Sequence, residues 1–138
     1  MRYYAVFDTN VLISSLLTKK PDTATAKVID AIAEQRIIPL YSEEIFEEYG
    51  EVLRRPKFPF SQERIDHILE MIKQFGISVE PSPTGEILPD ADDLVFYEVV
   101  MERRGDDAYL ITGNKKHFPD RNFIVTPAEM MALLGIGE

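Results

Sequence analysis

The sequence has no cysteine, and its only histidines, His67 and His117, lie far apart in the chain. The absence of cysteine excludes a disulfide framework and any zinc site built from thiolates. A metal ion bound by this protein would therefore be held mainly by oxygen atoms, which are the ligands that hard cations such as Mg²⁺ prefer.

Long hydrophobic runs are also absent. No stretch approaches the roughly 18 to 20 apolar residues of a membrane span. The apolar run at the N-terminus is interrupted by Asp8 and Asn10, which is unlike a signal peptide. We expect a cytoplasmic protein that does not insert into a membrane.

Basic residues are outnumbered by acidic ones. The chain has 15 Lys and Arg against 24 Asp and Glu, which gives a net charge of −9. This balance excludes a broadly basic surface that binds nucleic acid through counterion release alone. It is compatible with a local basic patch.

The length of 138 residues, 45% of them hydrophobic, is sufficient for one domain with a substantial core, so we expect a single domain over residues 1–138. Short apolar segments that suit strands alternate with segments of helical periodicity. The predicted strands are residues 3–7, 37–41, 77–80, 108–112 and 123–125. The predicted helices are residues 11–17, 23–35, 43–55, 62–75, 90–104 and a last one from Pro127.

This alternation predicts an α/β fold, because parallel strands need crossover connections, which are usually helices. We expect a three-layer α/β/α sandwich with a five-stranded parallel sheet. In such sheets ligands bind beyond the carboxyl ends of the strands. Two polar corners fall there, Asp8-Thr9-Asn10 and Thr112-Gly113-Asn114.

Asp8 lies between two segments that both appear buried, and a buried carboxylate is costly unless a hydrogen-bond donor, a basic group or a metal offsets its charge. Helix capping is the alternative explanation, since Asp and Asn both suit an N-cap. Three consecutive polar residues exceed what a cap requires. The pattern therefore favours a metal ligand with supporting hydrogen bonds.

Glu48 differs from the other glutamates of its predicted helix because it falls within the apolar stripe that Ile45, Tyr49 and Val52 form. The other four suit an ordinary solvated face: Glu43, Glu44, Glu47 and Glu51. Glu48 is thus a second candidate ligand. The alternative is a glutamate at the edge of the stripe whose carboxylate reaches water.

A third group of acids, Asp90, Asp92 and Asp93, opens the apolar helix of the segment LPDADDLVFYEVV. Acids favour the positive end of a helix dipole, and Asp90 with Asp93 resembles a capping box, so capping alone could explain them. If the three groups of acids converge in one crevice, their mutual repulsion calls for a divalent cation. Carboxylate ligands suit Mg²⁺ or Mn²⁺, ions that activate water for phosphodiester hydrolysis.

The segments DTN, SEEIFEEYGEVLRRPKF, DADDLVFYEVV and TGNKKHFP together resemble the PIN domain family, specifically its toxin-like subgroup. The resemblance covers nearly the whole chain. It implies a Mg²⁺- or Mn²⁺-dependent ribonuclease on an α/β/α sandwich. It also implies RNA as substrate, a toxin role in a VapC-like toxin-antitoxin pair with a small antitoxin as partner, and a homodimer.

The resemblance also assigns roles to individual residues. It implies that Asp8, Glu48 and Asp93 are the catalytic acids and metal ligands, with Asp90 as a helper. The family's fourth acid often follows the TG corner, where this chain has Asn114, an amide without charge. That departure puts a second metal ion in doubt.

Three neighbouring polar residues, Thr9, Asn10 and Thr112, resemble groups that orient the ligating carboxylates, although capping and turn formation would also explain them. The candidates for substrate binding are Lys115, Lys116 and His117, because they follow the TG corner. The alternative there is a solvated loop.

Aromatic residues beside basic ones offer two further candidates. Phe118 could stack on a base or anchor its loop. Phe58 and Phe60, in the segment RRPKFPF, could contact single-stranded RNA or a protein partner, or anchor the loop in the core.

Two other functions remain open from the sequence. Asp8 could be the nucleophile of a phosphatase similar to the haloacid dehalogenases, although Asn10 stands where that family has a second aspartate. The chain could also be a binding module that keeps its acids for folding, with Asn114 as a sign of weakened catalysis. The last helix carries Met130, Met131, Leu133 and Leu134, which suit either a dimer surface or the core.

Overall fold

A sheet of five parallel strands forms the centre of the structure, a computed structural model that describes residues 2–135. The strands are β1 (Tyr3–Phe7), β2 (Ile37–Tyr41), β3 (Ile77–Ser78), β4 (Tyr109–Ile111) and β5 (Ile124–Val125). Their order is β3-β2-β1-β4-β5, and every neighbouring pair is parallel. The predicted fold class is confirmed. Met1 and residues 136–138, which the expected domain includes, lie outside the described residues.

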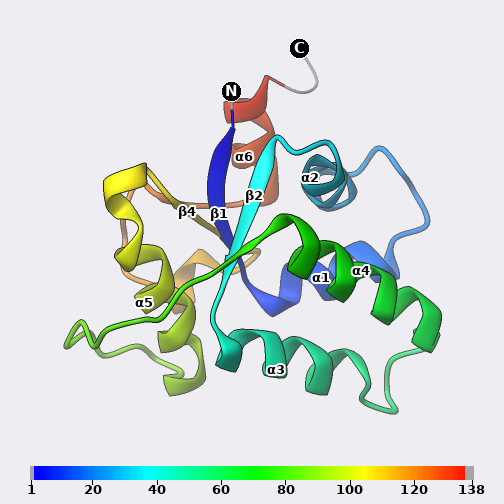
Figure 1. Cartoon of the computed structure of the whole chain (residues 1–138), viewed down its shortest axis with the longest axis horizontal. Coiled ribbons are helices and arrows are strands. Elements are labelled where there is room, and N and C mark those ends of the chain that lie inside the picture. Colours follow the sequence, from blue (N-terminus) through cyan, green and yellow to red (C-terminus); the bar gives the residue numbers. More distant parts are fainter. Residues whose placement is uncertain (1, 136–138) are drawn as a thin grey trace.

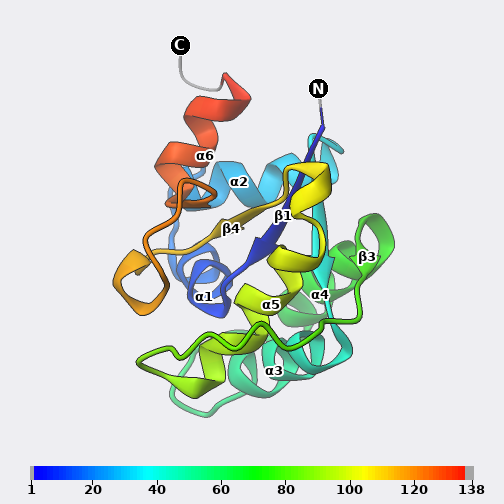
Figure 2. The same ribbon diagram turned by 90° about the vertical axis from the view of Figure 1, so that its left-hand side faces the viewer.

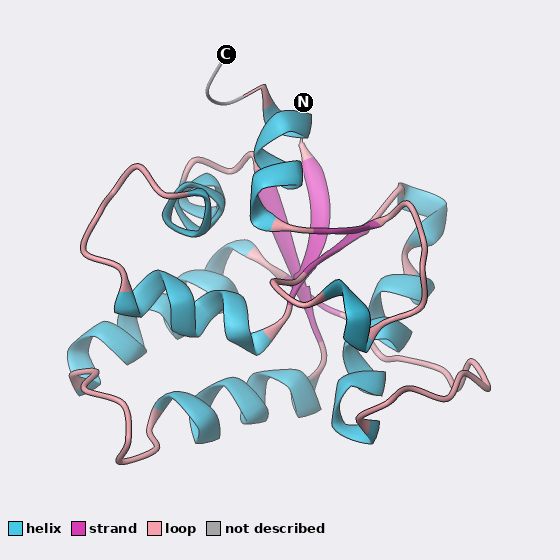
Figure 3. Ribbon diagram, turned by 180° about the vertical axis from the view of Figure 1, so that it is seen from behind, coloured by secondary structure: helices cyan, strands magenta, loops and turns pink. Residues whose placement is uncertain are grey.

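Helices flank the sheet on both sides. They are α1 (Thr9–Leu17), α2 (Ala24–Ala33), α3 (Glu43–Leu53), α4 (Gln62–Phe75), α5 (Leu94–Glu102) and α6 (Pro127–Leu134). In Figure 1, α5 lies to one side of β1 and β2 and α2 lies to the other; the turned view in Figure 2 places α5 in front of β1. Figure 3 shows the same arrangement from behind, with the strands enclosed by helices. None of the helices within residues 2–135 is long and apolar enough to cross a membrane.

Side-chain caps mark the starts of three helices. The hydroxyls of Ser42 and Ser61 accept hydrogen bonds from backbone amides in the first turns of α3 and α4. Thr126 and Glu129 form a reciprocal capping box at α6. Each bond satisfies an amide that has no partner inside its helix, which is why these residues fix where the helices begin.

Two predicted elements differ from those observed. The strand predicted over 77–80 is limited to Ile77–Ser78, and the helix predicted over 90–104 is divided. Its first turn, Ala91–Asp93, is a 3₁₀ helix, because the Asp90 carboxylate accepts from the Asp92 amide at 3.0 Å and tightens the chain. Asp90 therefore caps this turn through Asp92, not through Asp93 as a capping box would require.

The core fixes α3 against the central strand. Tyr49 is 1% exposed, and its hydroxyl donates a hydrogen bond to the carbonyl of Phe7, the last residue of β1. The Tyr49 ring also packs against the ring of Phe96 on α5, with the two ring centroids 6.3 Å apart. A buried tyrosine hydroxyl needs such a partner, so this bond sets how α3 lies on the end of β1.

Candidate active-site cleft

Asp8 directly follows the central strand and is 4% exposed. Phe7 pairs with Ile111 in the sheet, so the residues after β1 and β4 are neighbours. Thr112, which is fully buried, donates its hydroxyl to Asp8 Oδ2 at 2.7 Å. Burial raises the pKa of Asp8, and the Thr112 bond opposes that rise in part. Asp8 occupies the N-cap position of α1, yet its carboxylate is bonded to the residue that follows the neighbouring strand β4.

Glu48 is the second acid of the site. It is half-buried, whereas the other glutamates of α3 are exposed, as the periodicity predicted. Thr9, the first residue of α1, donates its hydroxyl to Glu48 Oε2 at 2.6 Å. Burial raises the pKa of Glu48, the bond from Thr9 opposes this rise, and the negative charges of Asp8 and Asp92 add to it. Thr9 and Thr112 thus each donate a hydrogen bond to one of the two carboxylates, and their role in orienting metal ligands stays a prediction.

Asp93 is the third acid. Its Oδ2 atom is buried and has no hydrogen-bond partner within the described residues, although His117 Nδ1 lies 3.3 Å away without the alignment of a hydrogen bond. Burial, followed by the charges of Asp8 and Asp90, raises the pKa of Asp93 to about 6, while His117 lowers it. The other ring nitrogen of His117 lies 3.0 Å from the side-chain amide of Asn114.

These acids line one cleft of about 380 Å³. The cleft brings together Asp8, Thr9, Asn10, Glu48, Asp90, Asp92, Asp93 and His117. Its remaining lining consists of Ile13, Val52, Arg55, Lys57 and Phe58. The sequence did not assign Arg55 or Lys57 to the site; the available signal was the basic and aromatic segment RRPKFPF.

The predicted lysines lie elsewhere. Lys115 and Lys116 line a separate hollow of about 240 Å³, and Lys115 Nζ lies 3.2 Å from Glu129 Oε1. Phe118, in the same loop, is 6% exposed and is part of the hydrophobic core, so it anchors the loop. Their predicted neighbour His117 faces the cleft instead, through its contact with Asp93.

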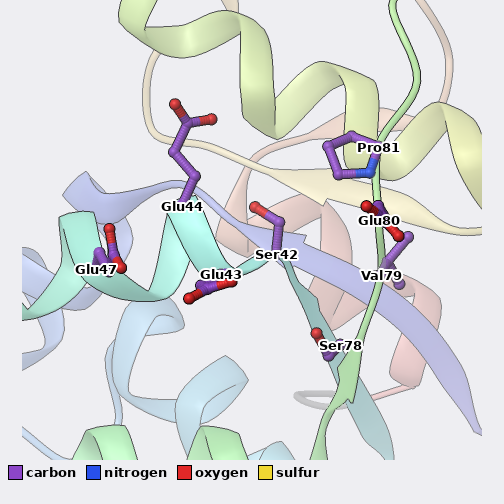
Figure 4. A pocket seen from close by; sticks show the side chains of 8 residues that line it. All are labelled: Ser42, Glu43, Glu44, Glu47, Ser78, Val79, Glu80 and Pro81. Carbon is purple, nitrogen blue, oxygen red and sulfur yellow. The ribbon is translucent and has the colours of Figure 1, made fainter.

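A larger hollow, of about 610 Å³, lies elsewhere in the structure. Figure 4 shows its lining: Ser42, Glu43, Glu44 and Glu47 from the start of α3, and Ser78, Val79, Glu80 and Pro81 from the chain at and after β3. It contains none of the predicted site residues. Its four glutamates are exposed, unlike Asp8 and Glu48 of the smaller cleft.

The donor set of the smaller cleft suits a hard cation. All three acids supply oxygen, burial and mutual repulsion disfavour their charges, and Asp93 Oδ2 has no hydrogen-bond partner within residues 2–135. Yet no three carboxylate or imidazole groups of the described chain converge closely enough to coordinate one ion. Asp8, Glu48 and Asp93 would have to approach one another by side-chain rotation to bind a metal.

Comparison with known proteins agrees with this arrangement. A family model described as "PIN domain" matches residues 4–116, which include all three acids. An uncharacterized protein of Methanocaldococcus jannaschii is 32% identical over 113 residues, which are 80% of this chain and 70% of that protein. No solved structure gives a significant match.

Proposed function

Because this chain belongs to the PIN domain family, whose members are typically nucleases, we propose that it is a Mg²⁺- or Mn²⁺-dependent endoribonuclease. The observation that carries this proposal is the cleft in which Asp8, Glu48 and Asp93 lie together with raised pKa values. Perturbed carboxylates in one cleft are typical of a catalytic site, and a charge-neutralising cation would explain why three of them are kept there.

In this proposal the three acids hold the ion. When bound, a divalent cation of this kind supplies a Lewis acid that activates water and stabilises the charge that develops on a phosphodiester. Thr112 donates a hydrogen bond to one oxygen of Asp8, and Thr9 donates one to an oxygen of Glu48. These bonds fix the orientation of the two carboxylates. Asp93 has a buried oxygen, Oδ2, that accepts no hydrogen bond from the described residues and is therefore available as a ligand of the ion.

His117 has a positioning role in this proposal. It lies between Asp93 and the side chain of Asn114, at 3.3 Å and 3.0 Å. When the Asn114 amide donates to Nε2, the ring hydrogen is on Nδ1 and faces the Asp93 carboxylate. Asn114 thus contributes through the orientation of His117 and without the charge of a fourth acid.

The direct test is cleavage of a panel of fluorogenic single-stranded RNAs in Mg²⁺, in Mn²⁺ or in EDTA. Asp8→Asn, prepared in parallel, removes the charge with almost no change in shape. We expect metal-dependent cleavage by the native protein and a loss of at least about 100-fold in the variant. Equal cleavage by both proteins would identify a contaminating nuclease and would contradict the proposal.

We also propose that the protein is the toxin of a toxin-antitoxin pair and that a small antitoxin covers the cleft. The uncompensated acids of the cleft support this, because they suit a basic side chain of a partner. Expression of the native chain, but not of Asp8→Asn, should then arrest growth of its host. Native purification should recover a small bound protein, and its absence together with normal growth would contradict the toxin role.

A binding module is the second candidate function. The separation of the three acids within the described chain, together with Asn114 at the fourth position, favours it. Calorimetry with Mn²⁺ distinguishes the two functions. Metal binding that depends on Asp8, without cleavage of any RNA in the panel, would favour the binding module over the nuclease.

A further inference from the structure

The loop between α3 and α4, residues 54–61, forms the wall of the cleft that carries no acid, with Arg55, Lys57 and Phe58. We propose that this loop binds the RNA strand: Phe58 stacks on an unpaired nucleobase and Lys57 contacts a backbone phosphate. This inference rests on the proposed nuclease function and adds the residues that hold the strand beside the three acids.

The two phenylalanines of the loop have different environments. Their rings stack with centroids 5.2 Å apart and an angle of 6° between their planes. Both side chains are half-buried; Phe60 packs against the hydrophobic core, whereas Phe58 lines the cleft. Phe60 therefore stacks against one face of the Phe58 ring. This arrangement presents an aromatic ring to the cleft, where the core does not require one.

The loop is also held in shape before any substrate binds. Pro56 and Pro59 each restrict the backbone to a narrow range, and the amide of Phe58 donates to the carbonyl of Arg55 at 3.0 Å to close a turn. A ring held in place by such a turn loses little conformational freedom when it stacks on a base. This rigidity suits a recognition element.

The two basic side chains of this wall, Arg55 and Lys57, differ in their contacts. Arg55 is committed to Glu51, with its Nη2 atom 3.0 Å from the carboxylate. Lys57 makes no ion pair within residues 2–135, and its ammonium lies over the Phe58 ring, 5.2 Å from the ring centre, in a cation–π contact that it would leave to reach a phosphate. Lys57 is therefore the cation of the cleft that is available for a phosphate.

Negative charges on the other side of α3 also favour a path of the RNA strand along Lys57 and Phe58. Glu44 lines both the hollow of about 610 Å³ and a smaller one that contains Glu48 and Asp92, so acidic side chains continue from the cleft along the α5 side of α3. Phosphates are repelled there. An RNA strand that passes the three acids meets an attractive surface at Lys57 and Phe58.

The geometry requires an unpaired base, because a base within a duplex has both faces covered by its stacked neighbours. Stacking on an aromatic side chain is strong and tolerates any base sequence. We therefore expect preference for single strands with little preference among bases at the Phe58 position. Duplex RNA of the same sequence should bind more weakly.

The test is fluorescence anisotropy of a labelled 12-nucleotide RNA, single-stranded or annealed, in the Asp8→Asn background so that the RNA stays intact. Phe58→Ala should weaken single-strand binding about tenfold, and Phe58→Tyr should retain most of it. Lys57→Gln should weaken binding and reduce the slope of log K against log salt by about 0.7. Lys73 is an exposed lysine in the last turn of α4, so Lys73→Gln is the matched control. It should leave the affinity for single strands and the salt slope unchanged.

Unchanged binding in Phe58→Ala and Lys57→Gln would overturn this inference while the nuclease function stands, provided that the native protein still cleaves. Absence of RNA binding would also overturn it and would leave the loop as a surface for a protein partner. If RNA binds through Phe58 but no metal or RNA preparation gives cleavage, the loop assignment stands and the nuclease function fails. Phe58→Ala should lower the melting temperature of its background only slightly, because Phe58 stacks on Phe60 but is not part of the buried core.

Discussion

At the scale of single residues, the pKa of Asp93 reflects both the burial of its carboxyl group and the charges of the acids around it. Burial and the charges of Asp8 and Asp90 raise this pKa from 3.8 to about 6. A folded pKa above the unfolded value means that the folded protein binds the proton more tightly. The contribution of Asp93 to stability is therefore full below about pH 4 and is lost as the pH rises through about 6.

This sign gives a first prediction. The free energy of unfolding of the metal-free protein should fall between about pH 4 and pH 6 through Asp93, in addition to any other titrating group. Asp93→Asn should flatten this part of the profile and raise the melting temperature at pH 7 by a few degrees. Urea unfolding at several pH values measures the slope. An unchanged slope in Asp93→Asn would show that the Asp93 carboxylate is already compensated.

A second prediction concerns Thr112. Thr112→Val keeps the shape of the side chain but removes the hydroxyl that donates to Asp8 Oδ2. The loss should cost about 1–3 kcal/mol, because it leaves a buried carboxylate oxygen unpaired, and should raise the pKa of Asp8 further. Thr112→Ser retains a donor and should recover most of the stability. Urea denaturation of both variants at pH 7 tests this, and equal stabilities would contradict the role of the hydroxyl.

At the scale of elements, α3 carries Glu48, whereas α4 carries no acid of the cleft. Ser42→Ala and Ser61→Ala each remove an N-cap and should each cost about 1 kcal/mol of stability. Only Ser42→Ala should also weaken metal binding, because fraying of α3 disturbs Glu48. Calorimetric titration with Mn²⁺ separates the two variants. Equal effects on metal binding would show that α3 is positioned by its packing alone.

The junction between α4 and β3 gives a further prediction. A Cβ atom on Gly76 would clash with the carbonyl oxygens of Ile72 and Pro39, which are backbone atoms and cannot rotate away. Gly76→Ala should therefore destabilise the protein by about 1–3 kcal/mol. Gly113 has no atom within 4 Å of the corresponding position, so Gly113→Ala is the matched control. Urea unfolding that gave equal stabilities would contradict the close packing at Gly76.

Most elements could be predicted because their signals are local. Ser42, Ser61 and Thr126 mark helix starts through bonds that span three residues, and periodicity alone distinguished Glu48 from its neighbouring glutamates. The 3₁₀ turn before α5 was missed because the sequence does not reveal which amide Asp90 will bind.

Contacts between distant loops could not be predicted for a different reason. His117 reaches Asp93, and Lys57 and Phe58 reach the cleft, only because whole helices and strands place those loops together. Such placement depends on tertiary packing and leaves no periodic pattern in the sequence. The predicted roles of Lys115 and Lys116 in substrate binding stay predictions.

At the scale of the whole molecule, the net charge of −9 makes the protein sensitive to cations in general. A bound ion stabilises the folded state in proportion to the logarithm of its concentration above the Kd. Mg²⁺ should therefore raise the melting temperature of the native protein, and Asp8→Asn should lose this response. Glu43→Gln, in the larger acidic hollow, should keep it. A response that both variants keep would indicate general screening of charge and would contradict a bound ion at Asp8.

The bond between Asp8 and Thr112 joins residues that are 104 positions apart, and Asp8 directly follows the central strand β1. During synthesis on the ribosome, Asp8 emerges long before β4 exists to pair with β1. We therefore expect the cleft to assemble only after β4 has emerged, and a chain that stops before β4 should lack the hydroxyl that orients Asp8.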